Sequence, residues 1–458
     1  MVKVAMLAGS VALASAAVIG AARRSYRLPV TSGRAKPVCD EPAAIIAGDR
    51  TRGTPLIWVS IFLLLISTCA VLPATPDRLP ALALGFYWIA SLMGQLFALP
   101  LLLVETVLAI VAHGAAAWVF AGGAVLFALA HFRNRRAARA MLAAVGQEAL
   151  RVPLHAGLTP FLTGTGGVRR IKDLAYGDAG KRNLLDVVVS HDPPSAPAPV
   201  LIHVHGGGWA TGDKDQQGKP LLHHMAGRGW VCFDATYRLG PADRGPAWII
   251  DVLRLIAWVR EHAAEYGGDP GRIAITGGSA GAHLAALAAL AHDDPAFKPG
   301  FEGADCSVAA VVALYGRYDF LDRNNRLKRN RAAVLDFMAT KIMPGAPAAC
   351  PDLWHAVSPI DRVRADAPPM LVVHGTADTM LPWQDAGDFA AKLRAMSRAP
   401  VEFVPLPGLQ HGWDGMASAL VWGHVRAIAA FLAPLENADA VFGRGPAAAR
   451  AERPAPTA

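Results

Sequence analysis

The chain has 458 residues, which exceeds the length of one ordinary domain. It is 53% hydrophobic and only 17% charged, a composition that excludes a typical soluble protein and indicates membrane segments. The net charge of +8 does not indicate a nucleic-acid partner, because the basic residues cluster beside apolar runs, where membrane orientation and anionic lipid account for them.

The N-terminal part, residues 1–136, is predicted to be a membrane region with three to four transmembrane helices. Val4–Ala22 is an apolar stretch that reads either as a span or as a signal-like segment. Leu56–Leu72 contains no charge and is about as short as a spanning helix can be. The pattern therefore predicts a multi-pass protein of the cell membrane.

Residues 81–132 are almost wholly apolar and are long enough for two antiparallel spans. We expect the break between them near Pro100 to Glu105, giving helices 81–99 and 106–130. Glu105 is then predicted to lie at the hairpin turn, in the membrane interface. The positive-inside rule gives no orientation, because residues 1–52 and residues 133–139 are both basic and an odd number of spans separates them.

From residue 137 onward the pattern changes to that of a soluble α/β domain. We expect a helical linker over 137–166, a catalytic domain over 167–435 and a disordered tail over 436–458. Strands alternate with helices in the catalytic domain, which predicts a largely parallel sheet with helices on both faces. The predicted strands are Val168–Tyr176, Asn183–Ser190, Val200–Val204, Trp230–Tyr237, 272–276, Val308–Tyr315, Pro369–Val373 and Val401–Leu406.

The most informative stretch is Gly277–Gly281, a G-x-S-x-G sequence centred on Ser279. An apolar strand precedes it and a run of good helix formers follows it, which is the context of a nucleophile elbow. The turn strains the serine backbone and leaves no room for side chains at the flanking glycines. Ser279 is therefore the candidate nucleophile, exposed at a helix N-terminus.

A second glycine run, His205-Gly206-Gly207-Gly208-Trp209, follows the predicted strand Val200–Val204. An HGGG sequence at this place is typical of the oxyanion loop of lipases and esterases. We expect the backbone N–H groups of Gly207, Gly208 and Ala280 to bind an oxyanion. We expect His205 and Gly206 to order the loop, and Trp209 either to line the pocket or to lie in the core.

The nucleophile needs a base and an orienting acid, in the chain order Ser, Asp, His. Asp378 stands on the loop after the strand that ends at Val373, and His411 follows the next strand. These two complete the candidate triad. His374 is a weaker candidate for the base because it lies too close to the strand end.

Two lesser features also lead to expectations. The basic segment Asp322–Arg331, together with the helix and loop that follow it as far as Pro359, predicts a cap or pocket wall, and the basic residues themselves predict a solvated or membrane-facing surface. The five cysteines, Cys39, Cys69, Cys232, Cys306 and Cys350, show no metal-ligand spacing, and we expect no metal. A Cys306–Cys350 disulfide remains open, depending on the compartment they face.

These sequences together resemble the hormone-sensitive-lipase-like branch of the α/β-hydrolases. Residues ~150–435 are similar to membrane-attached carboxylesterases of actinobacteria and to isoprenylcysteine methylesterases. The acid segment, His374 to Asp378, departs from the usual D-P-L-x-D pattern and is more like that of feruloyl-esterase and formamidase relatives. The resemblance implies an α/β-hydrolase fold and hydrolysis of carboxylic esters without a cofactor.

Three functions follow from these observations. The first is a membrane-anchored serine carboxylesterase or lipase acting on a small-molecule or lipid ester, with membrane lipid as its surroundings and no nucleic-acid partner. The second is an arylformamidase-like amidase, since the acid segment leaves the substrate class open. The third is a catalytically inactive membrane scaffold, which is disfavoured because no triad or oxyanion position is substituted. The sequence does not give the oligomeric state.

Overall fold

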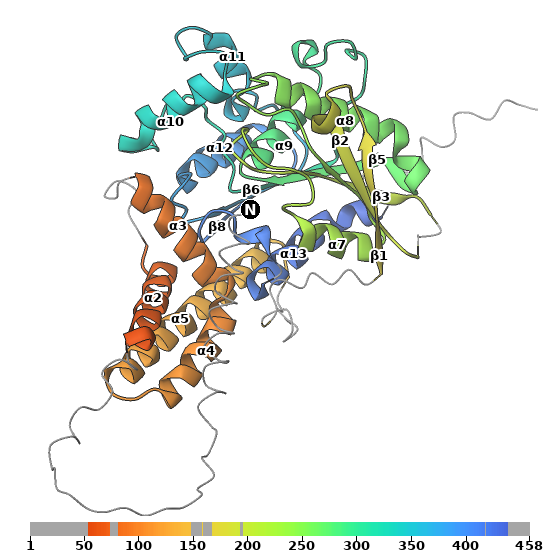
Figure 1. Ribbon diagram of the computed structural model, residues 1–458. Coiled ribbons are helices and arrows are strands. Elements are labelled where there is room, and N and C mark those ends of the chain that lie inside the picture. The colour runs from red at the N-terminus through yellow and green to blue at the C-terminus, as the bar shows by residue number, and fades with distance from the viewer. Residues whose placement is uncertain are drawn as a thin grey trace, which may run out of the picture. The chain divides into compact units, whose positions relative to one another are not determined.

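The computed structural model in Figure 1 describes residues 54–73, 81–147, 158, 167–192, 196–416 and 418–437. The predicted segment Val4–Ala22 lies outside these residues, as does the predicted tail 436–458 apart from Glu436, which belongs to a helical turn, and Asn437. The chain from Val59 onward forms one compact unit, which contains both the N-terminal helices and the sheet.

The centre of the fold is an eight-stranded sheet with the strand order β1-β2-β4-β3-β5-β6-β7-β8. The first three strands in this order pair antiparallel, and all later pairs are parallel. The mixed sheet has the topology expected for an α/β-hydrolase and matches the predicted strands closely. The strands are β1 (Val168–Ala175), β2 (Leu184–Ser190), β3 (Ala198–Val204), β4 (Val231–Ala235), β5 (Gly268–Gly278), β6 (Ala310–Leu314), β7 (Met370–Gly375) and β8 (Val401–Leu406).

Helices cover both faces of this sheet, which is why its central strands read as continuous apolar runs. Alternate side chains of one strand enter different cores; for example, Ile202 faces one core cluster and Leu201 the other. One face packs against α8 (Ala247–His262), α9 (Ala280–Leu290) and α12 (Trp383–Met396). The opposite face packs against α7 (Lys219–Gly227) and α13 (Ala419–Leu432).

Shorter elements complete the catalytic part. Two helices, α10 (Arg331–Phe337) and α11 (Pro351–Ala356), lie between β6 and β7, within the predicted cap. Single helical turns are found at η2 (Gly180–Asn183), η3 (Ala263–Tyr266), η4 (Pro295–Phe297), η5 (Lys328–Asn330), η7 (Pro359–Asp361), η8 (Trp413–Gly415) and η9 (Ala433–Glu436), with a π-helical turn at η6 (Met338–Ile342).

The N-terminal region is helical, but its breaks differ from those predicted. Its helices are α2 (Thr54–Val71), α3 (Ala81–Leu96), α4 (Ala98–Val111) and α5 (Ala115–Ala144). The chain bends at Phe97 and again before α5, where Gly114 has a φ of +63°. Pro100 does not interrupt the helix. It lies in the first turn of α4, where the backbone N–H groups have no hydrogen-bond acceptor within the helix.

Glu105 consequently does not lie at a hairpin turn, and that prediction was wrong. It lies in the middle of α4, with a fully buried side chain. It packs against α5 at Gly123, where an added Cβ would lie 2.5 Å from Glu105 Oε1. The glycine therefore makes room for the carboxyl group.

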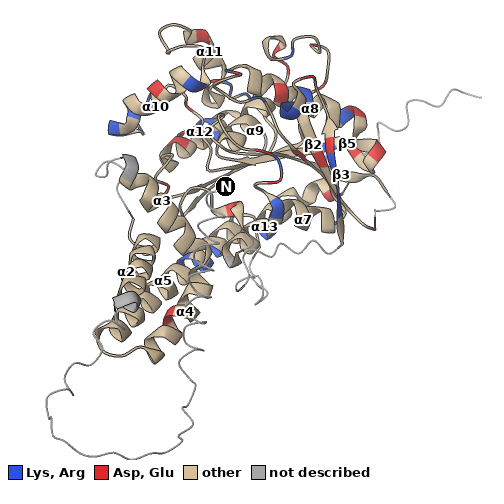
Figure 2. Ribbon diagram, in the orientation of Figure 1, with Lys and Arg blue, Asp and Glu red and all other residues tan. Residues whose placement is uncertain are grey.

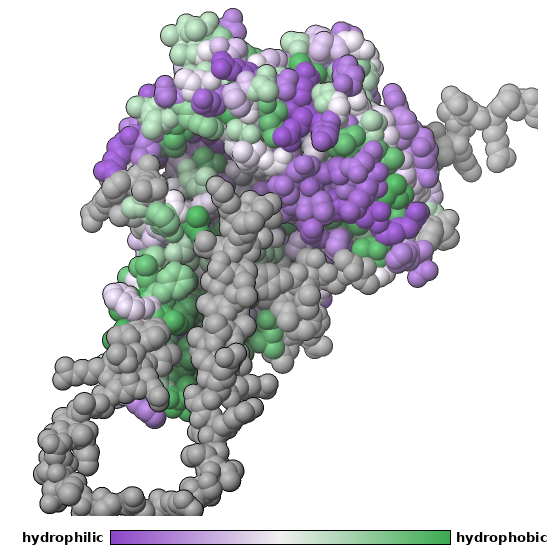
Figure 3. Space-filling model, in the orientation of Figure 1, coloured by the Kyte–Doolittle hydropathy of each residue, from purple (hydrophilic) through white to green (hydrophobic). Residues whose placement is uncertain are grey.

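Among the described residues, one helix is long and apolar enough to cross a membrane, Ala115–Ala144. A second crossing is counted only if α3 and α4, which meet at 84°, are taken together as one broken span. Helices α2 and α3 carry no Lys, Arg, Asp or Glu (Figure 2). In Figure 3 the visible described surface of the N-terminal helices is mostly hydrophobic.

Two of these helices also pack on the sheet. Leu92 and Leu96 of α3, with Met141 and Leu142 of α5, belong to the same core cluster as Val373 of β7. Helix α5 runs without a break through the predicted domain boundary at residue 136. Its second half therefore serves as a layer of the catalytic fold.

The possible Cys306–Cys350 disulfide is absent. Both residues are free thiols, and Cys306 is buried. Their sulfur atoms instead lie within hydrogen-bonding distance of the carbonyl oxygens of Leu253 and Gly345 respectively.

Candidate active site

Ser279 lies at the sharp turn between β5 and α9. Its backbone has a φ of +57° and a ψ of −119°, a conformation that non-glycine residues rarely adopt. A Cβ on Gly277 would lie 2.5 Å from the carbonyl oxygen of Val204, and one on Gly281 would overlap the same oxygen. The two glycines allow β5 and α9 to meet closely enough to project the serine hydroxyl, which is partly exposed.

His411 joins this serine to an acid. Its Nε2 lies 2.9 Å from Ser279 Oγ, and its Nδ1 lies 2.7 Å from Asp378 Oδ2. Since a carboxylate can only accept, a neutral imidazole here carries its proton on Nδ1 and presents Nε2 as an acceptor to the hydroxyl. The structure thus brings together all three predicted residues in the arrangement of a serine–histidine–aspartate triad.

The acid lies on the loop after β7 and is fully enclosed by donors. Its Oδ1 accepts hydrogen bonds from the backbone N–H groups of Met380 and Leu381, each at 2.8 Å. Burial would raise the pKa of Asp378, but the charge of His411 and the hydrogen bonds from His374 and His411 hold that pKa well below its usual value. Asp378 is therefore ionised at neutral pH.

His374 is a member of this site that the sequence analysis set aside. Its Nε2 lies 2.9 Å from Asp378 Oδ2, the oxygen that also faces His411. Nε2 is also 3.2 Å from the carbonyl oxygen of Leu381, and both neighbours can only accept, so Nε2 carries the proton. The four-residue separation of His374 and Asp378 was the available signal, since it joins a strand end to the loop that follows.

The predicted oxyanion loop lies directly beside the serine. A Cβ on Gly206 would lie 3.1 Å from Ser279 Cβ, and the Gly206 N–H donates to Gln217 Oε1 at 2.8 Å. Gly207 and Gly208 have φ values of +123° and +59°. Their N–H groups donate to no acceptor within the described part of the chain. The Ala280 N–H opens α9 and has no intrahelical partner.

The residues around this loop hold its shape. The His205 ring stacks on Tyr237 at 4.4 Å, and Tyr237 Oη donates to the His205 carbonyl oxygen at 2.9 Å. Burial lowers the pKa of His205 to about 4, so this ring is neutral and suits a structural role. Trp209 lies in the core, where its Nε1 contacts His283 Nδ1 at 3.2 Å.

A cavity of about 520 Å³ adjoins the acid loop. Its wall combines Pro73, α3, the segment from Asn325 into α10, and the loop that follows β7 together with the start of α12. Asp378 itself is part of the wall, and Trp383 also lines the cavity. The apolar part of the lining consists of Leu84, Trp88, Leu327, Val334, Met380, Leu381, Pro382 and Trp383. The volume lies within the usual range for small-molecule sites.

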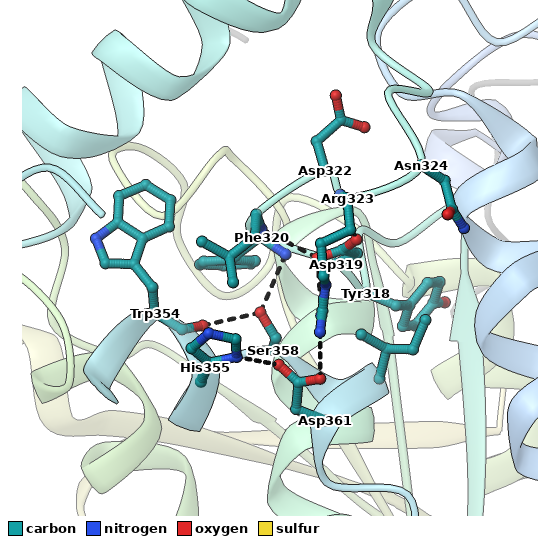
Figure 4. Close-up of polar contacts among 12 residues, drawn as sticks. Tyr318, Asp319, Phe320, Asp322, Arg323, Asn324, Trp354, His355, Ser358 and Asp361 are labelled. Carbon is teal, nitrogen blue, oxygen red and sulfur yellow. Dashed lines mark hydrogen bonds and ion pairs between the residues drawn. The ribbon is translucent and has the colours of Figure 1, made fainter. Parts of the chain in front are cut away.

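The base of the predicted cap is fastened by the network in Figure 4. Arg323 Nη1 pairs with Asp361 Oδ1 at 2.6 Å, and His355 Nδ1 lies 2.9 Å from the other oxygen of that carboxylate. The buried Ser358 Oγ accepts from the Phe320 N–H at 3.1 Å and donates to the Trp354 carbonyl oxygen at 2.8 Å. The basic segment is therefore tied to neighbouring acids, with Arg326 paired to Asp388 at 2.8 Å.

Known carboxylic ester hydrolases are similar to this chain in sequence. The BD-FAE family model matches residues 185–393, which include Ser279 and Asp378. The chain is 41% identical over 262 residues to the probable carboxylic ester hydrolase LipM of Mycobacterium tuberculosis, covering 57% of this chain and 60% of LipM. It is 30% identical to esterase LipI of the same organism over 55% of this chain and 77% of LipI.

One solved structure supports the fold. A truncated carbohydrate esterase from gut microbiota superposes with a TM-score of 0.50 at 24% sequence identity, covering 60% of this chain and 98% of that one. The match to LipM leaves about two-fifths of that relative uncovered. The chain belongs to the hormone-sensitive-lipase-like branch of the α/β-hydrolase esterases.

Proposed function

We propose that the chain is a serine carboxylic ester hydrolase in which Ser279 is the nucleophile, His411 the general base and Asp378 the orienting acid. One observation carries the proposal: the 2.9 Å and 2.7 Å contacts that link Ser279 Oγ through the His411 ring to Asp378 Oδ2. Support also comes from the position of the serine on a strained turn, which leaves its hydroxyl accessible.

In the first half-reaction, His411 Nε2 takes the proton of Ser279 Oγ as the oxygen attacks the ester carbonyl carbon. The protonated ring is stabilised by Asp378, whose low pKa keeps it negative. The tetrahedral intermediate collapses, and Nε2–H passes its proton to the leaving alcohol. Water, activated by the same nitrogen, then attacks the acyl-enzyme, and Ser279 regains its proton as the acid leaves.

The oxyanion that forms in both steps would be bound by the N–H groups of Gly207, Gly208 and Ala280. Support comes from the first two donors lacking any acceptor among the described residues while lying on a loop beside Ser279. Each such donor contributes ~3 kcal/mol to the barrier reduction in comparable sites. His205 and Gly206 support the loop through their hydrogen bonds, and Trp209 anchors the end of the loop by packing in the core.

The cavity of about 520 Å³ is our candidate for binding the apolar part of the ester. Its wall includes Asp378 together with apolar side chains of α3 and α10. An acyl or alcohol chain of a lipid ester would pack against these apolar side chains, although Arg326 and Lys328 also line the cavity.

We also propose that the N-terminal helices attach the enzyme to a membrane. Support comes from large apolar side chains that point outward from α2, α4 and α5 although water would penalise this exposure. Ile110 is 76% exposed and Trp118 is 82% exposed. The last turn of α4, which contains Ile110, and the first turn of α5, which contains Trp118, carry no charged residue. The exposed set also includes Phe62, Leu65, Leu103, Val104, Val107, Val111, Val125, Leu129 and Phe132.

The experiment that tests the proposal is turnover of p-nitrophenyl esters from acetyl to palmitoyl by detergent-purified protein, with Ser279→Ala as the control. The expected result is ester hydrolysis by the wild type and a loss of about 10⁴-fold or more in kcat for Ser279→Ala. Hydrolysis that persists in Ser279→Ala would reject the assignment of the nucleophile. Well-folded wild type that turns over amide substrates but no ester would replace the esterase by an amidase.

A further inference from the structure

Helix α3 of the N-terminal region holds the loop that carries His411. Trp88 Nε1 donates a hydrogen bond to the carbonyl oxygen of His411 itself, at 3.0 Å. Gln95 lies two turns further along the same face of α3, and its Nε2 donates to the Gly408 carbonyl oxygen at 2.9 Å. Gln95 Oε1 accepts from the Gln410 N–H at 3.1 Å. Two side chains thus fix three backbone groups between Gly408 and His411.

These contacts are made in a buried environment. Gln95 is 3% exposed, and the His411 loop shares a core cluster with Leu92 and Leu96 of α3 through Leu406 and Leu409. Buried hydrogen bonds are electrostatically stronger than exposed ones, and a buried backbone group that loses its partner pays the full cost of desolvation. Any movement of the loop that breaks these hydrogen bonds therefore costs free energy.

Helix α3 is in turn held by α5. Asn134 Nδ2 donates to the backbone carbonyl oxygen of Gln95 at 2.7 Å, and Asn134 is 4% exposed. This bond fixes the turn of α3 that presents the Gln95 side chain. The position of the His411 loop is therefore set by two helices that precede the sheet in the chain.

The same loop reaches the acid through the Gln410 side chain. Its Oε1 accepts from the Thr379 N–H at 2.8 Å, from Thr379 Oγ1 at 3.1 Å and from the His411 N–H at 3.0 Å. Thr379 directly follows Asp378. A continuous path of hydrogen bonds thus runs from Asn134 through Gln95 and Gln410 to the residue beside the acid.

We propose that Trp88 and Gln95 are positioning residues for His411, so that the N-terminal helices complete the active site as well as attaching the enzyme; this inference rests on the proposed function. His411 lies on irregular chain between β8 and η8, and such chain moves unless it is fixed. The reaction requires His411 Nε2 to stay within hydrogen-bonding distance of Ser279 Oγ while Nδ1 keeps its hydrogen bond to Asp378. A displacement of 1 Å in such a site costs up to about 100-fold in rate.

The test compares Trp88→Phe and Gln95→Met with wild type in the full-length, detergent-purified protein. Phenylalanine keeps one aromatic ring and removes the indole N–H together with the five-membered ring, a loss of volume that the Trp118→Phe control shares. Methionine keeps the length of glutamine and removes both of its hydrogen bonds. The matched control is Trp118→Phe, which removes an indole that is 82% exposed on α5. The readouts are kcat and KM for a short ester, and the second-order rate of labelling by a fluorophosphonate.

We expect Gln95→Met to lower kcat and the labelling rate together by about tenfold or more, with KM unchanged, because positioning affects the chemical step. Trp88→Phe should lower kcat and the labelling rate to a smaller extent, and these two rates are its readouts because Trp88 also lines the proposed substrate cavity. Trp118→Phe should change neither rate. If Gln95→Met melts below the assay temperature, the kcat and labelling rate of Trp88→Phe decide whether the inference holds. Folded variants with wild-type kcat and labelling rates would overturn the inference and leave the proposed function intact. Wild type that neither labels nor hydrolyses would instead refute the proposed function.

Discussion

His374 Nε2 lies 2.9 Å from Asp378 Oδ2, so the candidate catalytic acid is held by two histidines through one oxygen atom. His374 is the penultimate residue of strand β7 and is fully buried, as is the carboxylate it contacts. Together with the backbone N–H groups of Met380 and Leu381 on Oδ1, the second histidine fixes the orientation of the carboxylate. It also contributes to the low pKa of Asp378.

We expect His374→Phe to weaken both the site and the fold. A hydrogen bond to a charged group contributes about 1.5–3 kcal/mol, and its loss leaves Asp378 with one donor fewer. Because the folded-state pKa of Asp378 lies below its unfolded value, its stabilising effect is full at neutral pH and is lost as the pH falls below about 4. The variant should therefore melt earlier at pH 7 and show a smaller difference from wild type near pH 3.

The control for this variant is His355→Phe. His355 also contacts a carboxylate, that of Asp361 at 2.9 Å, but its side chain is 54% exposed. Exposed pairs of this kind contribute little, so its melting temperature should stay close to that of wild type. Equal effects of the two substitutions would contradict the role we give to His374.

His424 should make the fold sensitive to acid. Burial lowers its pKa to about 3, and neither ring nitrogen has a hydrogen-bond partner among the described residues. Below about pH 6.5 the unfolded chain binds a proton that the folded chain does not, so stability falls as the pH drops from 6.5 toward 3. We expect His424→Leu to retain stability at pH 7 and to lose less than wild type at pH 5.

Thermal melting at pH 7, 6 and 5 measures this effect. His191→Leu is the matched control, because it removes an imidazole that is exposed on the loop after β2. A wild-type pH profile in His424→Leu would show that the buried ring is not the source of the acid sensitivity.

Filling the cavity should shorten the preferred acyl chain. Val334 on α10 lines the cavity of about 520 Å³, so Val334→Trp should raise KM for decanoyl and longer esters while the acetyl ester is turned over as before. Ala332→Trp adds the same bulk to the exposed face of α10 and should leave the profile unchanged. An unchanged chain-length profile in Val334→Trp would place the apolar part of the substrate elsewhere.

The base of the cap should depend on Ser358. Ser358→Ala leaves the buried Phe320 N–H without its acceptor, which costs about 1–3 kcal/mol. A decrease in melting temperature of a few degrees is expected, whereas Ser190→Ala, at a more exposed hydroxyl, should have little effect. If the two variants melt alike, the network of Figure 4 does not stabilise the cap.

The residues of the candidate site could be predicted because each lies where a strand ends. Gly277–Gly281 and Gly206–Gly208 are local patterns, in which the close approach of backbones permits only glycine. Asp378 and His411 follow from the fixed order of such residues along this fold. The strands were equally readable, since their apolar runs are buried on both faces.

The supporting residues could not be predicted, because their partners are distant in the chain. Trp88 and Gln95 contact a loop more than 300 residues away, and nothing near them in the sequence indicates it. The break expected at Pro100 was misplaced because proline is tolerated in the first turn of a helix. His374 was set aside on its position alone, although its side chain reaches the acid across one turn of chain.

The most direct test of the central claim is to locate the covalent adduct formed with a fluorophosphonate. The probe reacts with a serine whose proton is taken by a neighbouring base, as we expect at Ser279. Intact-mass measurement and peptide mapping should find one adduct per chain, on Ser279, with labelling abolished in Ser279→Ala and much slower in His411→Ala. An adduct on another residue, or none on folded wild-type protein, would contradict the account.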